Sequence, residues 1–369
     1  MAIKQPKSAS YLPTLDGWRA IAVLLVLCFH GPLIVLGPFN DSFLHRYGSL
    51  GVDIFFAISG LLICSRLLRE EDRLGKLSLS RFYIRRAFRI LPPAFFFLAV
   101  LGTLSLTHHL PISLGEWLGA MFFFRNYSSL CGPPSTGSYY TSHFWSLAVE
   151  EHFYLILPLL LLLTHRRFRL AAMLSLTALV VLLRAVLSLH RPLLLIALHT
   201  EVRIDALFIP AIVAVLLHTS PGFRAGCKKW LRFWPVLLLI FFGWFLPGLH
   251  SPQPRFILAP FFLTAIVTGS VLNSADLPGR FLELAPLRFI GRISYSLYLW
   301  QMLFFVMPSP GGDPWYHRYP WQALCTLACA LFSYYLIEQP FVKLGSRFAP
   351  AIVPGREAET IPANPNPAI

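Results

Sequence analysis

Long apolar stretches follow one another along the chain, with short polar or basic segments between them. A helix that crosses the hydrocarbon layer of a membrane needs about 20 mostly apolar residues, and about ten stretches of this sequence come close to that length. The pattern therefore predicts an all-α fold, a polytopic membrane protein built as a bundle of about ten transmembrane helices. The predicted spans are 15–36, 48–68, 88–107, 143–164, 169–190, 204–219, 232–249, 256–273, 291–308 and 320–338.

A further apolar stretch, residues 112–124, is too short to cross a membrane as a straight helix. We interpret it as a re-entrant or interfacial segment that continues into the Gly-, Pro- and Ser-rich residues 125–142. Together, residues 108–142 are predicted to form an outer loop, a candidate lid or acceptor-binding surface.

Basic residues gather between the apolar stretches. The chain has 31 Lys and Arg against 17 Asp and Glu and a net charge of +14, although only 13% of its residues are charged and 56% are hydrophobic. Such clusters mark cytoplasmic loops, and all of them reach the cytoplasm if the N- and C-termini are both cytoplasmic. Because they do not form one face or tail, we expect membrane lipids and not nucleic acid as partners. The clusters are 66–89, 165–169, 224–232 and 280–292.

The predicted membrane domain covers residues 11–345. Residues 1–10 form a cytoplasmic N-terminus, and the Pro- and Ala-rich residues 346–369 are predicted to be a disordered cytoplasmic tail. The first apolar stretch is not expected to be a cleaved signal peptide, because Asp16 and Arg19 interrupt it and no small-residue cleavage site ends it. Six cysteines show neither metal-ligand spacing nor a disulfide framework, so no metal is expected.

Arg19 and His30 lie within the first predicted transmembrane helix. Their separation advances an α-helix by about 16 Å and rotates it by about 1,100°, close to three full turns, so both side chains share one face. Ionisable residues inside a membrane face the bundle interior and mark a functional site by default. The alternative is that both only hydrogen-bond neighbouring helices. This pair is the first candidate for a buried catalytic site.

Carboxylates occur in two further predicted helices. Asp53, near the outer end of the second, can orient His30 or pair with an arginine; the alternative is an exposed carboxylate favoured by the helix dipole. Glu150 and Glu151 lie two turns into the fourth, where adjacent carboxylates are costly unless cations pair with them. Each glutamate is a candidate catalytic residue or one half of a structural salt bridge.

Arginines are dense in residues 81–93, at the start of the third predicted helix. Arg85, Arg86 and Arg89 fall on neighbouring helical positions at the membrane surface. Guanidinium groups match phosphate oxygens in geometry and charge, so these three are candidates for binding a nucleotide-like anion. Lipid headgroups are the alternative partner.

Seven short motifs follow one another in the sequence: 15–20 with His30, 51–60, 82–90, 145–151, 203–207, 293–300 and 338–340. In this order they resemble the acyltransferase-3 family of integral membrane acyltransferases, over roughly residues 11–345. The resemblance implies a ten-helix bundle that transfers an acyl group from cytoplasmic acyl-CoA, usually acetyl-CoA, to a hydroxyl of a carbohydrate or glycoconjugate acceptor, often on the outer side.

The resemblance also implies that Arg19 and His30 are the essential pair and that Arg86 and Arg89 engage CoA. The sequence departs from the family at Gln301, where many members carry histidine, so no proton-transfer role is implied there. We expect no extracytoplasmic hydrolase-like domain, which some members carry, and we expect transfer to occur unaided or with a separate partner.

These observations combine into one hypothesis, an O-acyltransferase of the bacterial inner membrane. The arginines hold the CoA phosphates, and His30 acts as general base or carries the acyl group. Asp53 or Glu150 orients His30, and Arg19 anchors the donor or stabilises the oxyanion. The alternative is a transporter or flippase-like protein that uses the polar interior as a substrate path. Polysaccharide, peptidoglycan, glycolipid and small-metabolite acceptors all fit the sequence.

Overall fold

The protein folds into helices throughout its described regular structure, which confirms the predicted all-α fold. The computed structural model describes residues 12–31, 48–190, 197–244, 252–306 and 314–350. A π-helical turn, Tyr334–Glu338 (η7), joins the last two helices. The helices are α1 (Pro13–His30), α3 (Leu50–Leu74), α4 (Leu79–Leu106), α5 (Leu114–Met121), α6 (Tyr139–Ser142), α7 (Phe144–Leu163), α8 (Arg169–His190), α10 (Thr200–Arg203), α11 (Asp205–Thr219), α12 (Pro221–Trp230), α13 (Trp234–Trp244), α14 (Pro252–Leu272), α15 (Leu277–Leu282), α16 (Ala285–Phe304), α17 (Trp321–Ser333) and α18 (Gln339–Phe348).

Six helical segments among the described residues are long and apolar enough to cross a membrane. A seventh span would join α11 to the helices after it, but that pair bends by 117°. The chain is thus an integral membrane protein, while the predicted ten spans are not confirmed. Other predicted spans are helices that are not long or apolar enough to meet this criterion. Helices α11 and α13 have only 15 and 11 residues, and the charged Arg288 and Arg292 make α16 less apolar. The six are Pro13–His30, Leu50–Leu74, Leu79–Leu106, Tyr139–Leu163, Arg166–His190 and Trp321–Phe348.

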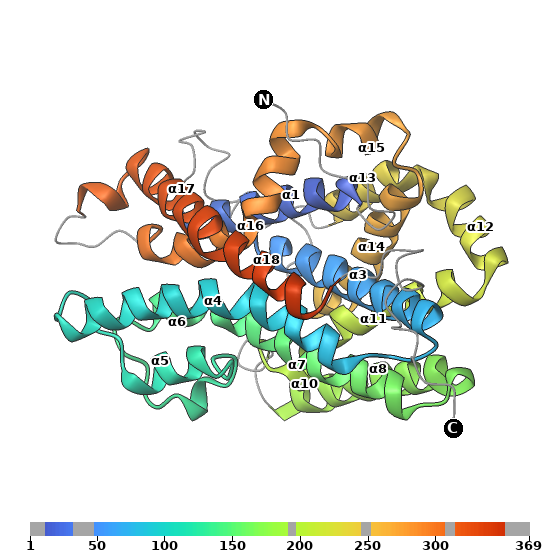
Figure 1. The fold of residues 1–369 in the computed structure, drawn as a ribbon, viewed down its shortest axis with the longest axis horizontal. Helices are drawn as coiled ribbons and strands as arrows, with labels where there is room; N and C mark the ends of the chain where they lie inside the picture. Colours follow the sequence, from blue (N-terminus) through green and yellow to red (C-terminus); the bar gives the residue numbers. More distant parts are fainter. Residues whose placement is uncertain (1–11, 32–47, 191–196, 245–251, 307–313, 351–369) are drawn as a thin grey trace, which may run out of the picture.

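Helix α1 lies in the middle of the bundle and packs against α16 and α3 (Figure 1). Glycines let these helices approach closely, as small residues do in membrane bundles. A β-carbon at Gly291 of α16 would lie 1.8 Å from the carbonyl oxygen of Asp16. One at Gly60 of α3 would lie 2.2 Å from the carbonyl oxygen of Leu207 in α11. These two contacts set the spacing of the helices that surround the site.

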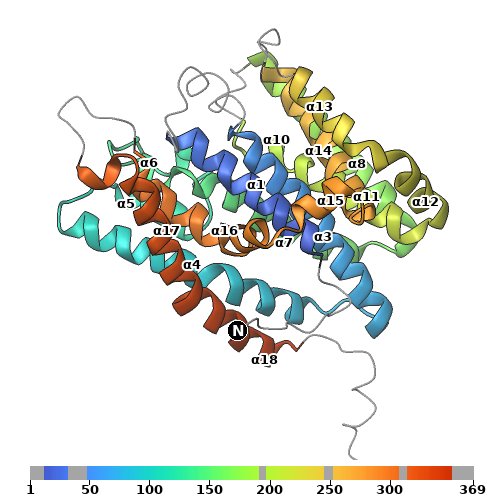
Figure 2. The ribbon, with the colours of Figure 1, turned by 90° about the horizontal axis from the view of Figure 1, so that it is seen from above.

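Helix α4 carries Pro92 and Pro93 in its middle. Proline has no N–H to donate to the preceding turn, so the helix is weakened there. This weakened part of α4 comes shortly after Arg89. Helix α16 stabilises it, because Tyr295 Oη donates a 2.8 Å hydrogen bond to the carbonyl of Ile90. In Figure 2, α18 lies along the same part of α4.

Helix α5 has eight residues, is about 12 Å long and cannot span a membrane. This length agrees with the interpretation of residues 112–124 as a short segment. The helix begins with a capping box, in which the side chain of Ser113 accepts from the backbone N–H of Glu116 and the Glu116 carboxylate accepts from that of Ser113. Helices α5 and α12 lie toward opposite ends of the molecule's longest axis (Figures 1 and 2).

Some predicted segments lie outside the described ranges. They include the N-terminal residues 1–10 and the part of the first predicted span beyond residue 31. The first residues of the predicted tail, 346–369, continue α18, which ends at Phe348. Residues 351–369 lie outside the description.

Candidate active site

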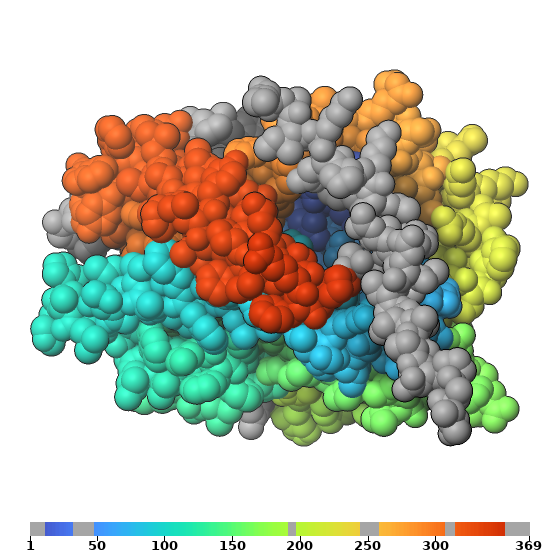
Figure 3. Space-filling model, in the orientation of Figure 1, coloured from blue at the N-terminus to red at the C-terminus, as the bar shows by residue number. Residues whose placement is uncertain are grey.

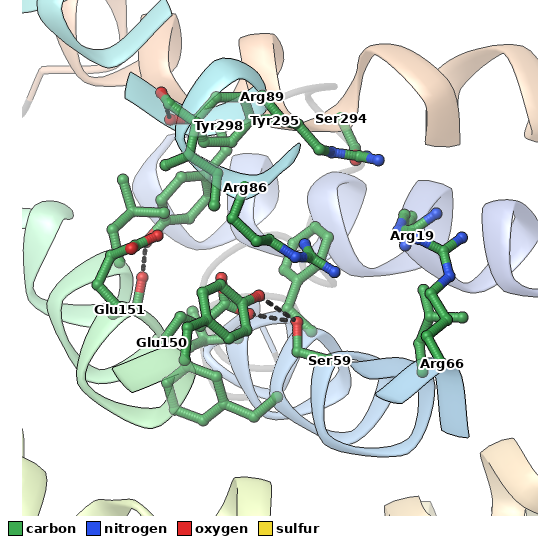
Figure 4. Close-up of a pocket in the computed structure, with 18 residues that line it drawn as sticks. Arg19, Ser59, Arg66, Arg86, Arg89, Glu150, Glu151, Ser294, Tyr295 and Tyr298 are labelled. Atoms are coloured by element: carbon green, nitrogen blue, oxygen red, sulfur yellow. Dashed lines mark hydrogen bonds between the residues drawn. The ribbon is translucent and has the colours of Figure 1, made fainter. Parts of the chain in front are cut away.

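A cavity of about 100 Å³ lies where α1, α3, α4, α7 and α16 meet. It brings together five of the eight predicted site residues, from segments far apart in the sequence. Figure 4 shows Arg86 between the glutamates of α7 and the arginines of α1 and α3. The charged and hydroxyl side chains of the wall are Arg19, Ser59, Arg66, Arg86, Arg89, Ser146, Glu150, Glu151, Tyr154, Ser294, Tyr295 and Tyr298.

Four arginines form one end of this cavity, which we call the arginine end: Arg19, Arg66, Arg86 and Arg89. Arg19 pairs with Asp16 at 3.0 Å. Among the described residues, no carboxylate lies within 4.0 Å of the other three guanidinium groups. Arg86 instead lies over the Tyr154 ring, 4.9 Å from its centroid. Like charges gathered in this way repel one another, and a bound anion would relieve the repulsion.

Two further cavities of about 200 Å³ each adjoin the arginine end. Arg66 and Arg89 line both of them as well as the central cavity. Val342 of α18 also lines both, so this helix lies between the two. In Figure 3, α18 lies across this face of the molecule, and blue atoms of α1 are visible in the hollow beside it. An elongated anion can therefore reach Arg66 and Arg89 from either cavity.

Glu150 and Glu151 line the cavity opposite the arginines of α1 and α3. Glu150 Oε1 accepts a 2.6 Å hydrogen bond from Ser59 Oγ, and Ser59 Oγ also lies 3.2 Å from the Tyr154 hydroxyl. Within the described chain, neither glutamate has a cationic group within 4.0 Å. The structural salt bridge considered for them is therefore not formed, and both carboxylates face the cavity.

Ser146 and Tyr298 of the cavity wall adjoin a region with two histidines, neither of which lines the cavity, and we call this region the histidine end. The hydroxyls of Ser146 and Tyr298 lie 2.6 Å apart, and Tyr298 Oη lies 2.9 Å from the backbone carbonyl oxygen of His143, to which it can donate. His143 lies one helical turn after Tyr139 in the sequence. The His30 ring lies 6.2 Å from the ring of Tyr139, centroid to centroid.

His30 is the last residue of α1 and is not among the residues that line the central cavity. Its Nδ1 lies 3.0 Å from the carbonyl oxygen of Val26. This contact favours the tautomer with the proton on Nδ1, in which Nε2 carries the lone pair that a base requires. Arg19 and His30 thus belong to opposite ends of the site, about 16 Å apart along one helix.

Asp53 is buried but does not line the cavity. It forms an ion pair with Arg203, which is distant from it in the sequence. Pairing with an arginine is therefore the arrangement that the structure contains, and the alternative of an exposed helix-start carboxylate is wrong. Asp53 thus fixes α3 against α10, one residue before α11 begins.

Arg85 differs from the two other arginines of its motif. It pairs with Glu70 of α3 at 2.5 Å, and it lines one adjoining cavity but not the central one. Each residue rotates an α-helix by 100°, so Arg85 points away from the central cavity that Arg86 and Arg89 line.

Three residues of the site were not predicted from the sequence: Ser59, Arg66 and His143. Arg66 belongs to a run of basic residues whose density indicates a cytoplasmic loop. That interpretation leaves unnoticed that Arg66 also lies on the face of α3 that lines the cavity. Residues seven apart share a helix face, and Val52, Ser59 and Arg66 all line the cavity at this spacing. That stripe is the signal that identifies both of the missed residues of α3.

A second buried polar network lies between α4 and α6, outside the membrane-spanning segments. Arg125 pairs with Glu116 at 3.5 Å and donates a 2.6 Å hydrogen bond to Ser138 Oγ. Burial acts to raise the pKa of Glu116, but hydrogen bonds from Ser135, Ser138 and backbone N–H groups outweigh it and lower the pKa to about 2. The network holds the chain segment that leads to His143.

Comparison with known proteins gives a consistent result. A family model described as an acyltransferase domain matches residues 12–338. The chain is 29% identical over 389 residues to the O-acetyltransferase OatA of Staphylococcus aureus (strain MRSA252), covering 95% of this chain and 60% of that protein. It is 30% identical over 385 residues to a putative O-acetyltransferase of S. aureus (strain COL), covering 94% of this chain and 60% of that protein. The chain spans about 60% of the length of these relatives, and no solved structure matches it.

Proposed function

This chain belongs to the membrane acyltransferase family whose domain it matches, and we propose that it transfers an acetyl group from acyl-CoA to a hydroxyl group of a carbohydrate acceptor. The names of the bacterial relatives support acetyl as the group and oxygen as the atom that receives it. We place the protein in the bacterial inner membrane with its arginine end toward the cytoplasm, where basic residues concentrate and acyl-CoA is made.

The observation that carries this proposal is the cluster of arginines that have no ion-pair partner among the described residues. Three guanidinium groups, from Arg66, Arg86 and Arg89, surround space without a carboxylate within 4.0 Å. The central cavity, about 100 Å³, has room for an acetyl thioester. The two adjoining cavities share Arg66 and Arg89, so the phosphates of CoA would bind there while the thioester enters the centre.

The proposed transfer joins the two ends of the site. The acceptor hydroxyl approaches from the histidine end, and its oxygen forms a bond to the thioester carbon as its proton moves to His30 Nε2. The carbon–sulfur bond then breaks, and the CoA thiolate leaves and is protonated. Arg19 or Arg86 offsets the negative charge that develops on the thioester oxygen. Glu150, held by Ser59, positions the groups of the central wall.

Direct binding of acetyl-CoA tests this assignment. We expect wild-type protein in detergent to bind acetyl-CoA and Arg86→Ala/Arg89→Ala to lose about 100-fold or more in affinity, since each of the two charged hydrogen bonds contributes about 1.5–3 kcal/mol. Arg167→Ala is the matched control, because Arg167 is exposed and lies on Phe168 outside these cavities. Equal affinity in all three proteins would contradict the donor site and favour a transport path that needs no acyl-CoA.

A further inference from the structure

His143 is an imidazole buried in an aromatic environment. It connects α6 to α7 and is only 2% exposed. The rings of Phe97, Phe144 and Tyr298 surround it with centroids at 5.5, 4.9 and 5.5 Å. Neither ring nitrogen has a hydrogen-bond partner among the described residues. The backbone of His143, in contrast, is engaged, since its carbonyl oxygen lies within hydrogen-bond distance of Tyr298 Oη and Ser146 Oγ.

A buried polar group without a partner destabilises a protein by about 1–3 kcal/mol, and most such groups are satisfied. Phenylalanine would fit the aromatic surroundings of His143 without that cost. The position also matters, because the backbone carbonyl of His143 contacts the hydroxyls of Ser146 and Tyr298, which line the cavity. His143 also lies one helical turn after Tyr139, whose ring is 6.2 Å from that of His30. A buried imidazole without a hydrogen-bond partner among the described residues therefore lies beside the wall of the central cavity, near the proposed base.

We infer that His143 binds the reacting hydroxyl of the acceptor, with one ring nitrogen donating a hydrogen bond to the hydroxyl oxygen. This inference rests on the proposed function and deepens it. With the oxygen held by the His143 N–H, the proton of the hydroxyl is directed toward His30, and a lone pair faces the thioester carbon. The proton then passes to His30 as the carbon–oxygen bond forms. His143 keeps its own proton and acts by holding the acceptor.

The test compares transfer, donor binding and stability in the same variants. Transfer is the alkali-labile radioactivity that membranes containing the protein incorporate into their own carbohydrate from [14C]acetyl-CoA. We expect His143→Phe to lower transfer at least about 10-fold, by analogy with the loss of a buried hydrogen bond. Its melting temperature should be unchanged or higher, because an unsatisfied polar group is removed, and acetyl-CoA affinity should match wild type. His143→Asn, which keeps a donor and an acceptor, should recover part of the lost transfer.

His152→Phe is the matched control. His152 Nδ1 lies 2.6 Å from Thr200 Oγ1, so this change should lower the melting temperature while transfer is retained. Transfer within twofold of wild type in His143→Phe would overturn the inference. So would a loss that accompanies a lower melting temperature or weaker acetyl-CoA binding, because that pattern indicates a structural role. If wild-type membranes transfer no acetate although the protein binds acetyl-CoA, the proposed function fails first and the inference with it.

Discussion

Arg66 contributes to all three cavities of the site. It lines the central cavity and both adjoining cavities, and the neighbouring cations include Arg86 and Arg89. Arg66 is exposed, and Arg86 and Arg89 are partly buried. Like charges placed together repel one another, so this arrangement lowers the stability of the free protein. Such a cost at a functional site is expected where a ligand of opposite charge binds.

We therefore predict opposite effects of Arg66→Gln on stability and on donor binding. Removing one of several like charges should raise the melting temperature, while the affinity for acetyl-CoA should fall about 10- to 100-fold. Thermal unfolding and equilibrium binding on the same preparation measure the two effects. Arg167→Gln, an exposed control, should change neither by much. A lower melting temperature with unchanged affinity would mean that Arg66 is structural.

Glu116 gives a pH dependence whose sign follows from its lowered pKa. The ordinary pKa of about 4.5 falls to about 2 in the folded protein. Its stabilising effect is thus complete above about pH 4.5 and is lost as the pH falls toward 2. Hydrogen exchange of the segment around α5 should accelerate between pH 4.5 and pH 3 after correction for intrinsic rates. In Glu116→Gln this extra acid sensitivity should disappear; an identical profile in both proteins would contradict the assignment.

Residue spacing within one helix was sufficient to predict part of the site. The depth of Glu150 in its predicted helix made it a candidate catalytic residue or one half of a salt bridge, and in the structure it lines the central cavity. The partner of Asp53 could not be found in this way, because Arg203 is 150 residues away in the sequence. His143 escaped notice because it lies at a junction between helices, where periodicity carries no information.

At the scale of elements, α3 is the helix around which the site is arranged. One face carries Ser59 and Arg66 into the cavity, and Gly60 allows α11 to approach its other side. Ser59 and Gly60 are adjacent, so the contact with α11 also fixes the direction of the hydroxyl that holds Glu150.

Gly60→Ala should separate α3 from α11. The new β-carbon would lie 2.2 Å from a backbone oxygen, so the helices must move, and overpacking of this kind lowers stability by about 1–3 kcal/mol. We expect a melting temperature lower by several degrees and reduced transfer activity. Gly226→Ala in α12, where nothing lies within 4 Å, should be neutral or stabilising. Equal behaviour of the two variants would contradict this role of Gly60.

Helix positions were predicted better than helix lengths. Apolar periodicity located the elements, but α11 ends at Thr219 and the chain then bends by 117°, which hydropathy averages do not reveal. Residues 112–124 were predicted to form a short segment because they are too few to cross a membrane, and α5 within them has eight residues. Tertiary packing decides where each helix bends or ends, and a single sequence does not contain that information.

At the scale of the whole molecule, the site is polarised along the bundle. Cations dominate one end and neutral hydroxyl and imidazole groups the other, which suits a phosphate-bearing donor and an uncharged acceptor that approach from opposite sides. The proposed function requires the arginine end to face the cytoplasm, the side on which both termini are predicted to lie.

Reporter fusions test this orientation. A green fluorescent protein joined after residue 350 should fluoresce, and alkaline phosphatase at the same position should be inactive, because the C-terminus is predicted to be cytoplasmic. Alkaline phosphatase inserted after Gly132, an exposed residue of the predicted outer loop, should be active. The reverse pattern at either position would require a different number of spans and would exclude cytoplasmic acyl-CoA as the donor.

The most direct measurement of the central claim is acetyl transfer by membranes that contain wild-type protein or His30→Ala. Wild-type membranes supplied with [14C]acetyl-CoA should incorporate alkali-labile acetate into carbohydrate, and His30→Ala should reduce it by about 100-fold or more, the loss expected for a general base. Acetyl-CoA affinity should be unchanged, since His30 lies at the end away from the arginines. Wild-type transfer by His30→Ala would contradict the account.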